Sequence, residues 1–262
     1  MCRLLGYLGT PIQLDRILYK PKHSLIVQSY QPKEMHIALL NADGFGVGWY
    51  HPQREENPYT YKNTLPIWND SNLPQLSRYI ESNTILSYVR SATPGLAVDI
   101  INCQPFVRDR LMFVHNGYIE NFRHKLRRPI RNLLSEEAEI WIQGNTDSEY
   151  LCALILTELQ THPDISIEEA MARVINRVGE LSKAENLRFI AAMIIGTGKR
   201  LIACRYSTFE DVPTLYWIRD DPNYSNAVIL ASEPLLEGNW QSCPEHHIVT
   251  VEEDLEINIS PF

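Results

Sequence analysis

Nine short apolar runs, separated by turns, constrain the fold of this chain more than any other feature of its sequence. Helical periodicity is clear in only two segments, 146–159 and 166–181, which both lie in the middle of the chain. Helices in the middle and strands at both ends favour antiparallel sheets covered by helices over a parallel βαβ series. The nine predicted strands cover residues 3–8, 47–50, 84–89, 111–115, 189–195, 201–205, 215–218, 228–231 and 247–251.

Local signals fix the ends of several of these elements. The segment Gly196–Lys199 reads Gly-Thr-Gly-Lys between two apolar runs, which predicts a tight turn between antiparallel strands. Ser166 and Glu169 form a capping box at the start of the second helix. Asp147 falls in the first turn of the first helix, where a carboxylate complements the helix dipole.

Composition excludes several classes of protein. The chain has 262 residues, 44% of them hydrophobic, so we expect one domain over residues 1–262 with a substantial core. Its longest uninterrupted apolar run, 189–195, is far shorter than the roughly 20 residues of a membrane-spanning helix. A formal net charge of −8 argues against binding to a nucleic-acid backbone.

Cysteine usage and the first residues bear on the compartment. The five cysteines are odd in number and have neither paired spacing nor a zinc-type cluster with histidine, so we expect no disulfide framework and no metal. The first residues, Met-Cys-Arg-Leu-Leu-Gly-Tyr-Leu-Gly, do not read as a secretory signal. Together these features predict a cytoplasmic protein.

Cys2 is the first candidate for chemistry. An initiator Met before a small residue is normally removed, so we expect a mature chain that begins at Cys2 and carries a thiol beside a free α-amino group. These groups ordinarily titrate at about 8.5 and about 8, close enough for one to take a proton from the other. Taken alone, however, a Met-Cys start is common by chance.

Three further segments have both a chemical and an ordinary structural interpretation. Arg90 follows a predicted strand and could bind a carboxylate, or form a surface ion pair. Asn116 and Gly117 could form an oxyanion hole, or an Asn-Gly turn after a strand that ends at Val114. The segment 144–149 could hold a ligand, or simply begin a helix.

Taken together and in this order, the segments resemble the class II glutamine amidotransferases of the N-terminal-nucleophile hydrolase superfamily. The likeness runs from residue 2 to about residue 160 and returns at 231–235. The motifs that carry it are Met-Cys-Arg-Leu-Leu-Gly-Tyr, Asp-Gly-Phe-Gly-Val-Gly-Trp (43–49), Arg-Ser-Ala-Thr (90–93), Asn-Cys-Gln-Pro-Phe (102–106), His-Asn-Gly (115–117), Thr-Asp-Ser-Glu (146–149) and Ala-Ser-Glu-Pro-Leu (231–235).

The resemblance implies both fold and roles. The fold would be α+β, a four-layer αββα sandwich of two antiparallel sheets. Cys2 would attack a γ-glutamyl amide carbonyl with its own α-amino group as base, and Asn116 and Gly117 would hold the oxyanion. Arg90 and Thr93 would bind the substrate, Arg90 at its α-carboxylate, while Asp147 would bind its α-ammonium. No cofactor is implied.

Two departures from the family pattern concern the substrate side of the pocket. Synthase-linked members read Arg-Trp-Ala-Thr-His-Gly where this chain has Ser91 and Pro94, and they often carry His where it has Gln104. The opening motif, the segment 23–30 and the Ser-Glu-Pro-Leu element look closest to the stand-alone branch. That branch contains the γ-glutamyl amidohydrolase of ergothioneine biosynthesis and an amidotransferase-like subunit of a glutathione-degrading complex.

Three functions are therefore to be weighed. The preferred one is hydrolysis of a γ-glutamyl amide of a small molecule in ergothioneine biosynthesis, because 262 residues leave room for the hydrolase domain alone. The second is a glutaminase or glutathione-handling subunit that acts with a partner enzyme. The third is a non-catalytic scaffold that retained the fold. Whether the chain forms a homodimer or needs a partner enzyme stays open.

Overall fold

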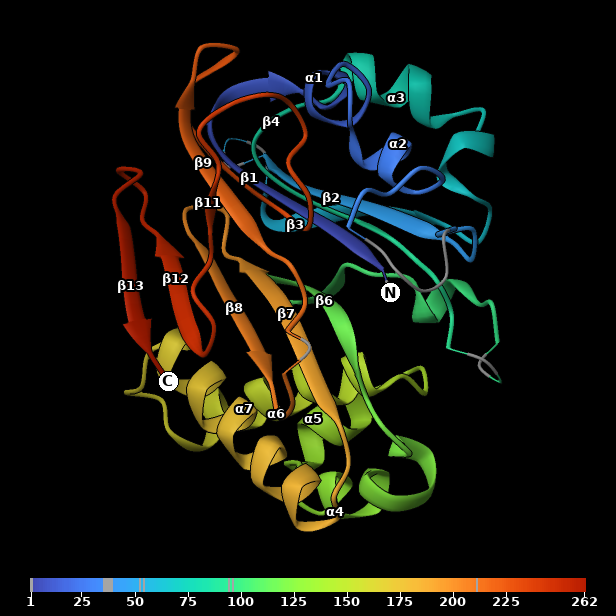
Figure 1. The fold of residues 1–262 in the computed structure, drawn as a ribbon, viewed down its shortest axis with the longest axis vertical. Helices are drawn as coiled ribbons and strands as arrows, with labels where there is room; N and C mark the ends of the chain where they lie inside the picture. Colours follow the sequence, from blue (N-terminus) through green and yellow to red (C-terminus); the bar gives the residue numbers. More distant parts are fainter. Residues whose placement is uncertain are drawn as a thin grey trace.

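Two antiparallel sheets lie face to face between two layers of helices in the computed structural model of the chain (Figure 1). The structure describes residues 2–34, 40–51, 53, 55–93, 95, 97–210 and 212–262. The predicted α+β, four-layer αββα architecture is thus confirmed. None of the helices among these residues is long and apolar enough to span a membrane.

The first sheet has β1 at its centre, and the strands on both sides of it are antiparallel to it. Its spatial order is β11 (Gln241–Ser242), β9 (Tyr216–Asp221), β10 (Tyr224–Ala231), β1 (Arg3–Gln13), β4 (Glu81–Val89), β2 (Phe45–His51) and β3 (Glu55–Asn63).

The second sheet places β6 and β7 side by side, with Asn116 opposite Ala192 in their register. Its spatial order is β13 (Ile257–Pro261), β12 (His247–Val251), β8 (Leu201–Ser207), β7 (Phe189–Gly196), β6 (Leu111–Ile119) and β5 (Phe106–Arg108). The β7–β8 hairpin predicted from the Gly-Thr-Gly-Lys turn is confirmed as antiparallel.

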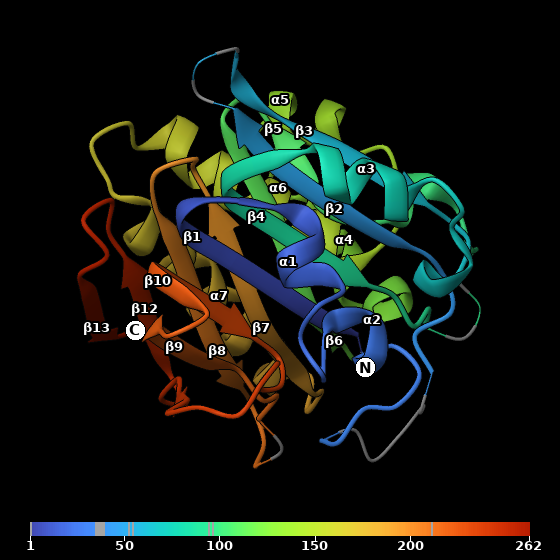
Figure 2. The same cartoon turned by 90° about the horizontal axis from the view of Figure 1, so that it is seen from above.

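The helices form the two outer layers, which Figure 2 shows from above. The first sheet is covered by α1 (Leu14–Leu18), α2 (Leu25–Gln28) and α3 (Leu73–Tyr79). The second is covered by η3 (Phe122–Leu126), α4 (Arg127–Arg131), α5 (Glu136–Trp141), α6 (Asp147–Thr161) and α7 (Ile167–Ala184). The remaining short turns are η1 (Ile67–Asn69) and η2 (Ile100–Asn102).

The expected concentration of helices in the middle of the chain is only partly right. Both long helices are where the periodicity placed them, and Ser166 caps α7 by accepting a hydrogen bond from the Glu169 N–H at 3.1 Å. The helices α1 to α3, however, lie in the first third of the chain. They have only four to seven residues, too few to give a helical period in the sequence.

Each central strand is buried on both faces. In β1, Leu5 and Tyr7 pack toward the outer helices, whereas Leu4 and Leu8 pack into the space between the sheets. This explains why the strands appear in the sequence as continuous apolar runs rather than as alternating ones. The edge strands β3 and β13 are largely exposed and polar, and they were not predicted.

Strand β6 is longer than the sequence indicated. It continues through Asn116 and Gly117 to Ile119, and both residues pair with β7. The alternative interpretation of Asn-Gly as a turn after Val114 is therefore wrong. Successive side chains of a strand point to opposite faces, so this extension decides where the Asn116 side chain points.

Candidate active site

The register of β1 and β4 brings Cys2 opposite Arg90. Arg3 pairs with Val89 and Leu4 with Tyr88, so the next step of the ladder sets Cys2 against Arg90. Leu4 and Tyr88 both belong to the apolar cluster between the sheets. Because residues two apart on a strand share a face, Cys2 and Arg90 point into the same inter-sheet space.

Asn116 reaches this space from the other sheet. On β6, Met112 and Val114 belong to the inter-sheet cluster, and Asn116 is the next residue on that face. The N-terminal end of β1 lies beside β6 in both views (Figures 1 and 2). Two sheets thus bring together residues 2, 90 and 116, which are distant in the sequence.

The Asn116 side chain is fully buried, yet neither its amide nitrogen nor its carbonyl oxygen has a hydrogen-bond partner among the described residues. A buried polar group without a partner costs roughly 1–3 kcal/mol, so such groups are rare unless something else uses them. A buried amide with free donors, on the inter-sheet side where Cys2 also lies, is suited to stabilise an oxyanion.

Gly117 permits a close backbone approach. A Cβ atom at this position would lie 1.9 Å from the Ile190 carbonyl oxygen of β7 and 2.6 Å from the His115 ring. Only glycine fits without separating the two strands. Gly117 therefore lets the backbones of β6 and β7 lie closer together here than a residue with a side chain would allow.

Cys2 is 8% exposed, and its sulfur contacts polar groups of β4 and of the loop that follows β4. The Tyr88 hydroxyl donates to Sγ at 2.8 Å, and the Ser91 N–H donates to it at 3.3 Å. The Ser91 carbonyl oxygen lies 3.5 Å from Sγ and can accept from the thiol. A sulfur with two donors is suited to carry negative charge.

The other four thiols lie in environments that keep them protonated. Burial raises the pKa of Cys204 and of Cys243 to about 12. Burial also raises the pKa of Cys103 and, much further, that of Cys152. A protonated, buried thiol is inert, so Cys2 is the only one of the five with the surroundings of a nucleophile.

Arg90 is a buried cation that has no carboxylate partner in the part of the chain that the structure describes. It is 3% exposed, and its side-chain hydrogen bonds within the described residues go to two backbone carbonyls, those of Asp43 at 3.4 Å and Ala97 at 3.3 Å. Long, neutral contacts do not compensate a buried guanidinium. A ligand carboxylate would supply the missing charge in the bidentate geometry that arginine favours.

Comparison with known proteins decides the family. The family model described as glutamine amidotransferases class-II matches residues 22–233. The chain belongs to this family.

Relatives with assigned names fall into two groups. The probable glutamine amidotransferase DUG3 of Saccharomyces cerevisiae is 29% identical, over 96% of this chain and 82% of that protein. A γ-glutamyl-hercynylcysteine sulfoxide hydrolase of Mycobacterium tuberculosis is 31% identical, over 96% of this chain and 93% of its own length.

Solved structures agree on the fold. A glutamine aminotransferase class-II domain protein from Silicibacter pomeroyi superposes with a TM-score of 0.72 at 25% identity, over 99% of both chains. The glutamine PRPP amidotransferase of B. subtilis superposes with a TM-score of 0.65 at 15% identity, over 99% of this chain and 49% of that one. The second likeness concerns the fold alone.

The remaining residues that the resemblance to class II amidotransferases predicted lie at the edges of this site. Thr93 is exposed on the loop after Arg90, and its side chain makes no hydrogen bond within the described residues. The same loop is held by the Asp43 carboxylate, which accepts from the Ala92 N–H at 2.8 Å. Met1 and Pro94 lie outside the described residues.

Asp147 is the first residue of α6 and ties that helix to the end of β6. Its carboxylate accepts from the Ile119 N–H at 2.7 Å and from the Ser148 N–H at 2.8 Å. Burial raises its pKa although both hydrogen bonds oppose the shift. Its partner Ile119 lies two residues after Gly117 on β6, and no contact within the described residues joins Asp147 to Cys2 or Arg90.

Gln104 has a backbone role that the sequence did not suggest. Its side-chain amide donates to the His115 carbonyl at 3.1 Å and accepts from the His115 N–H at 2.5 Å. This pair of bonds holds β6 directly before Asn116. The departure from the family pattern at Gln104 therefore concerns the residue that holds the backbone next to Asn116, the candidate for the oxyanion hole.

A buried ion network behind Cys2 was not predicted at all. Arg3 and Glu233 form an ion pair at 2.9 Å, and His23 lies 2.7 Å from the same carboxylate. The Arg3 guanidinium also donates to the Cys2 carbonyl at 3.0 Å. The segments 23–30 and 231–235 had carried family likeness, but only the fold shows that they meet behind residue 2.

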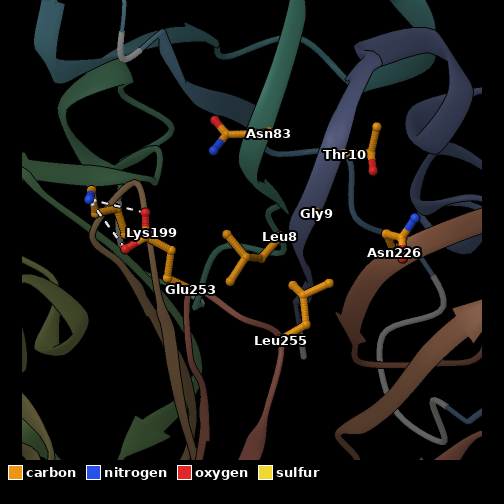
Figure 3. Close-up of a pocket in the computed structure, with 8 residues that line it drawn as sticks. All are labelled: Leu8, Gly9, Thr10, Asn83, Lys199, Asn226, Glu253 and Leu255. Atoms are coloured by element: carbon orange, nitrogen blue, oxygen red, sulfur yellow. Dashed lines mark hydrogen bonds and ion pairs between the residues drawn. The ribbon is translucent and has the colours of Figure 1, made fainter.

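A half-open hollow of about 240 Å³ lies elsewhere, beside the second half of β1 (Figure 3). It is lined by Leu8, Gly9 and Thr10, so at about 3.3 Å per residue it begins roughly 20 Å along the strand from Cys2. Lys199 and Glu253 form an ion pair at 3.0 Å within it, which compensates both charges. This hollow contributes nothing to the site at Cys2.

Proposed function

We propose that the chain hydrolyses a γ-glutamyl amide bond, with Cys2 as the nucleophile. The observation that carries this proposal is the placement, by the strand registers, of three groups in one inter-sheet space: a thiol, an amide without a hydrogen-bond partner and a guanidinium without a carboxylate partner among the described residues. Each of the three has a defined task in amide hydrolysis on a glutamate side chain. A scaffold without activity would have no use for the buried, unpartnered Asn116 amide.

The first half of the reaction forms a thioester. Sγ of Cys2 attacks the γ-carbonyl carbon while the α-amino group of the mature chain takes the thiol proton. The C=O electron pair moves onto oxygen, and Asn116 and the Gly117 N–H stabilise this oxyanion. When the carbonyl re-forms, the C–N bond breaks, and the leaving amine takes the proton from the α-ammonium.

The second half releases glutamate. Water adds to the thioester carbonyl while the α-amino group takes one of its protons, and the same two donors hold the oxyanion. The C–S bond then breaks, and the sulfur takes that proton from the α-ammonium to become the thiol again. Arg90 binds the α-carboxylate of the glutamyl group, with Thr93 beside it on the loop. Asp147 binds the α-ammonium, and its fixed position at the start of α6 supports that role.

For the substrate we propose a γ-glutamyl conjugate of the ergothioneine pathway, γ-glutamyl-hercynylcysteine sulfoxide. The support is the relative of that name, which aligns over 96% of this chain. The similar identity of DUG3, named a probable glutamine amidotransferase, favours a second candidate in which the chain releases glutamate from glutamine or glutathione beside a partner enzyme.

Glutamate release from three substrates separates these candidates. The purified chain is incubated with γ-glutamyl-hercynylcysteine sulfoxide, glutathione or glutamine, and kcat/KM is compared. Preference for the sulfoxide supports the first candidate, and preference for either of the others supports the second. A glutamine-like diazoketone should label Cys2 in all cases, and Cys2→Ala should lose both labelling and hydrolysis whereas Cys103→Ala should keep them.

A further inference from the structure

Of the polar side chains that the structure describes, only Tyr88 contacts the Cys2 sulfur, and the proposed mechanism has no role for its hydroxyl. Tyr88 lies on β4, is 3% exposed, and packs its ring in the cluster between the sheets. Within the described residues, its hydroxyl makes a single hydrogen bond, the 2.8 Å bond to Sγ. Because this buried hydroxyl donates to the Cys2 sulfur and to no other described atom, we look for its role in the chemistry of that sulfur.

The Tyr88 hydroxyl is held in its protonated form. Burial raises the pKa of Tyr88 well above that of an exposed tyrosine, and the neighbouring Cys2 raises it further. Tyr88 is therefore a neutral donor and cannot serve as a base. Together with the Ser91 N–H at 3.3 Å, it gives Sγ two donors from the same strand and the loop that follows it.

We propose that Tyr88 is a catalytic residue that stabilises the Cys2 thiolate. The proposal rests on the proposed role of Cys2 as the nucleophile. A charge-assisted hydrogen bond is about twice as strong as a neutral one, so the donor favours thiolate over thiol before the attack.

The same donor acts in the second half of the reaction. When the tetrahedral adduct of water and thioester collapses, the C–S electron pair returns to sulfur. Tyr88 and the Ser91 N–H stabilise the thiolate that leaves, which is then protonated by the α-ammonium. In the first half, the sulfur loses this charge as the C–S bond forms, so we expect the gain to appear chiefly in thiolate population and thioester hydrolysis.

The test is the pH dependence of Cys2 alkylation by iodoacetamide, followed by mass spectrometry of the Cys2 peptide. Tyr88→Phe keeps the ring that packs between the sheets and removes only the donor. We expect the midpoint of its alkylation profile to rise by about one pH unit and its kcat to fall about tenfold, with KM little changed. An unchanged midpoint would overturn the proposal.

Tyr50→Phe is the matched control. Tyr50 belongs to the same inter-sheet cluster, but its hydroxyl donates to the carbonyls of Arg110 and Gly196, both at 2.7 Å. Its loss should affect stability and leave the Cys2 midpoint unchanged. An equal midpoint shift in both variants would mean that loosening of the core, and not the lost donor, moves the profile, which also overturns the proposal.

A second variant retains both the ring and the hydroxyl. Fluorotyrosine at position 88 is a more acidic donor, so the Cys2 midpoint should fall below that of the unmodified protein, and failure to fall would contradict the proposal. Cys2→Ala separates this inference from the proposed function. Retained hydrolysis in Cys2→Ala would refute the function itself, whereas an inactive Cys2→Ala with a Tyr88→Phe that behaves as wild type would refute only the role of Tyr88.

Discussion

Arg3 and Glu233 form an ion pair in which both side chains are only 1% exposed, directly behind the residue that carries the thiol. The carboxylate also accepts from the Lys33 N–H at 2.8 Å and lies 2.7 Å from the His23 ring. These contacts hold the pKa of Glu233 below its ordinary value although burial acts in the opposite direction. The network joins the N-terminal strand to the strand-end segment at 232–235 and thereby fixes the position of Cys2.

Removal of this carboxylate charge should therefore destabilise the fold. In Glu233→Gln, the Arg3 guanidinium stays buried without a counter-ion, which costs roughly 3–5 kcal/mol. Urea unfolding measures this loss. Glu245→Gln is the matched control, because Glu245 is half exposed and pairs with Arg205 at 3.3 Å. Its loss should cost no more than about 1 kcal/mol, and similar costs for both variants would contradict the role given to the network.

His115 predicts a definite pH dependence of stability. Burial lowers its pKa from 6.5 to about 4. Between these two values the unfolded chain binds a proton that the folded chain does not, so the free energy of unfolding falls as the pH is lowered from about 6.5 to 4. Over this range the free energy of unfolding falls by about 3 kcal/mol in total, because each pKa unit corresponds to about 1.36 kcal/mol.

This contribution should be absent from His115→Phe, so the difference in unfolding free energy between wild type and variant should shrink as the pH falls. The matched control is His124→Gln, since His124 is exposed on η3. It should follow the wild-type profile. Parallel profiles for wild type and His115→Phe between pH 7 and 4 would show that His115 does not carry this dependence.

Asn116→Ala should separate catalysis from stability. Loss of one oxyanion donor lowers kcat about 10²–10³-fold, while KM changes little because the ground-state carbonyl depends less on it. The unfolding free energy should change by less than about 1 kcal/mol, because the lost amide has no hydrogen-bond partner among the residues described and its removal relieves a desolvation cost. Steady-state kinetics and urea unfolding of the same sample separate the loss of activity from any loss of stability. A large loss of stability would mean that the amide has a structural partner.

Gly117→Ala should damage the fold as well as the activity. The new methyl group would meet the Ile190 carbonyl oxygen at 1.9 Å, so β6 and β7 must separate where Asn116 is held. Gly196→Ala is the matched control on the same strand pair, since its Cβ would meet only Leu86 and Leu201 side-chain atoms at 3.3–3.7 Å. Thermal unfolding should show a clear loss for the first variant and a small change for the second. Equal midpoints of thermal unfolding for the two variants would contradict the close approach of Gly117 to the Ile190 carbonyl oxygen.

More of the fold than of the site could be predicted from the sequence. Strand-like segments such as 84–89, in which most residues are apolar, identify strands buried on both faces, and they also conceal Tyr88, which reads as one more core residue. The contact of Arg3 with Glu233 joins opposite ends of the chain, and no local period reports it. Family motifs named Asn116 and Arg90, but only the register of β1, β4 and β6 shows which face each side chain occupies.

Arg90 should determine substrate affinity through its planar pair of donors. In Arg90→Lys, the charge remains but bidentate binding of a carboxylate is lost, so we expect KM for a γ-glutamyl substrate to rise at least about tenfold. Glutamate should raise the thermal midpoint of the wild type and should do so far less in the variant, because a ligand stabilises only the form that binds it. Arg78→Lys, on the solvent-facing side of α3, controls for the substitution itself. If Arg90→Lys kept the wild-type KM and the full glutamate response, Arg90 would not bind the substrate carboxylate, and its buried charge would need another partner.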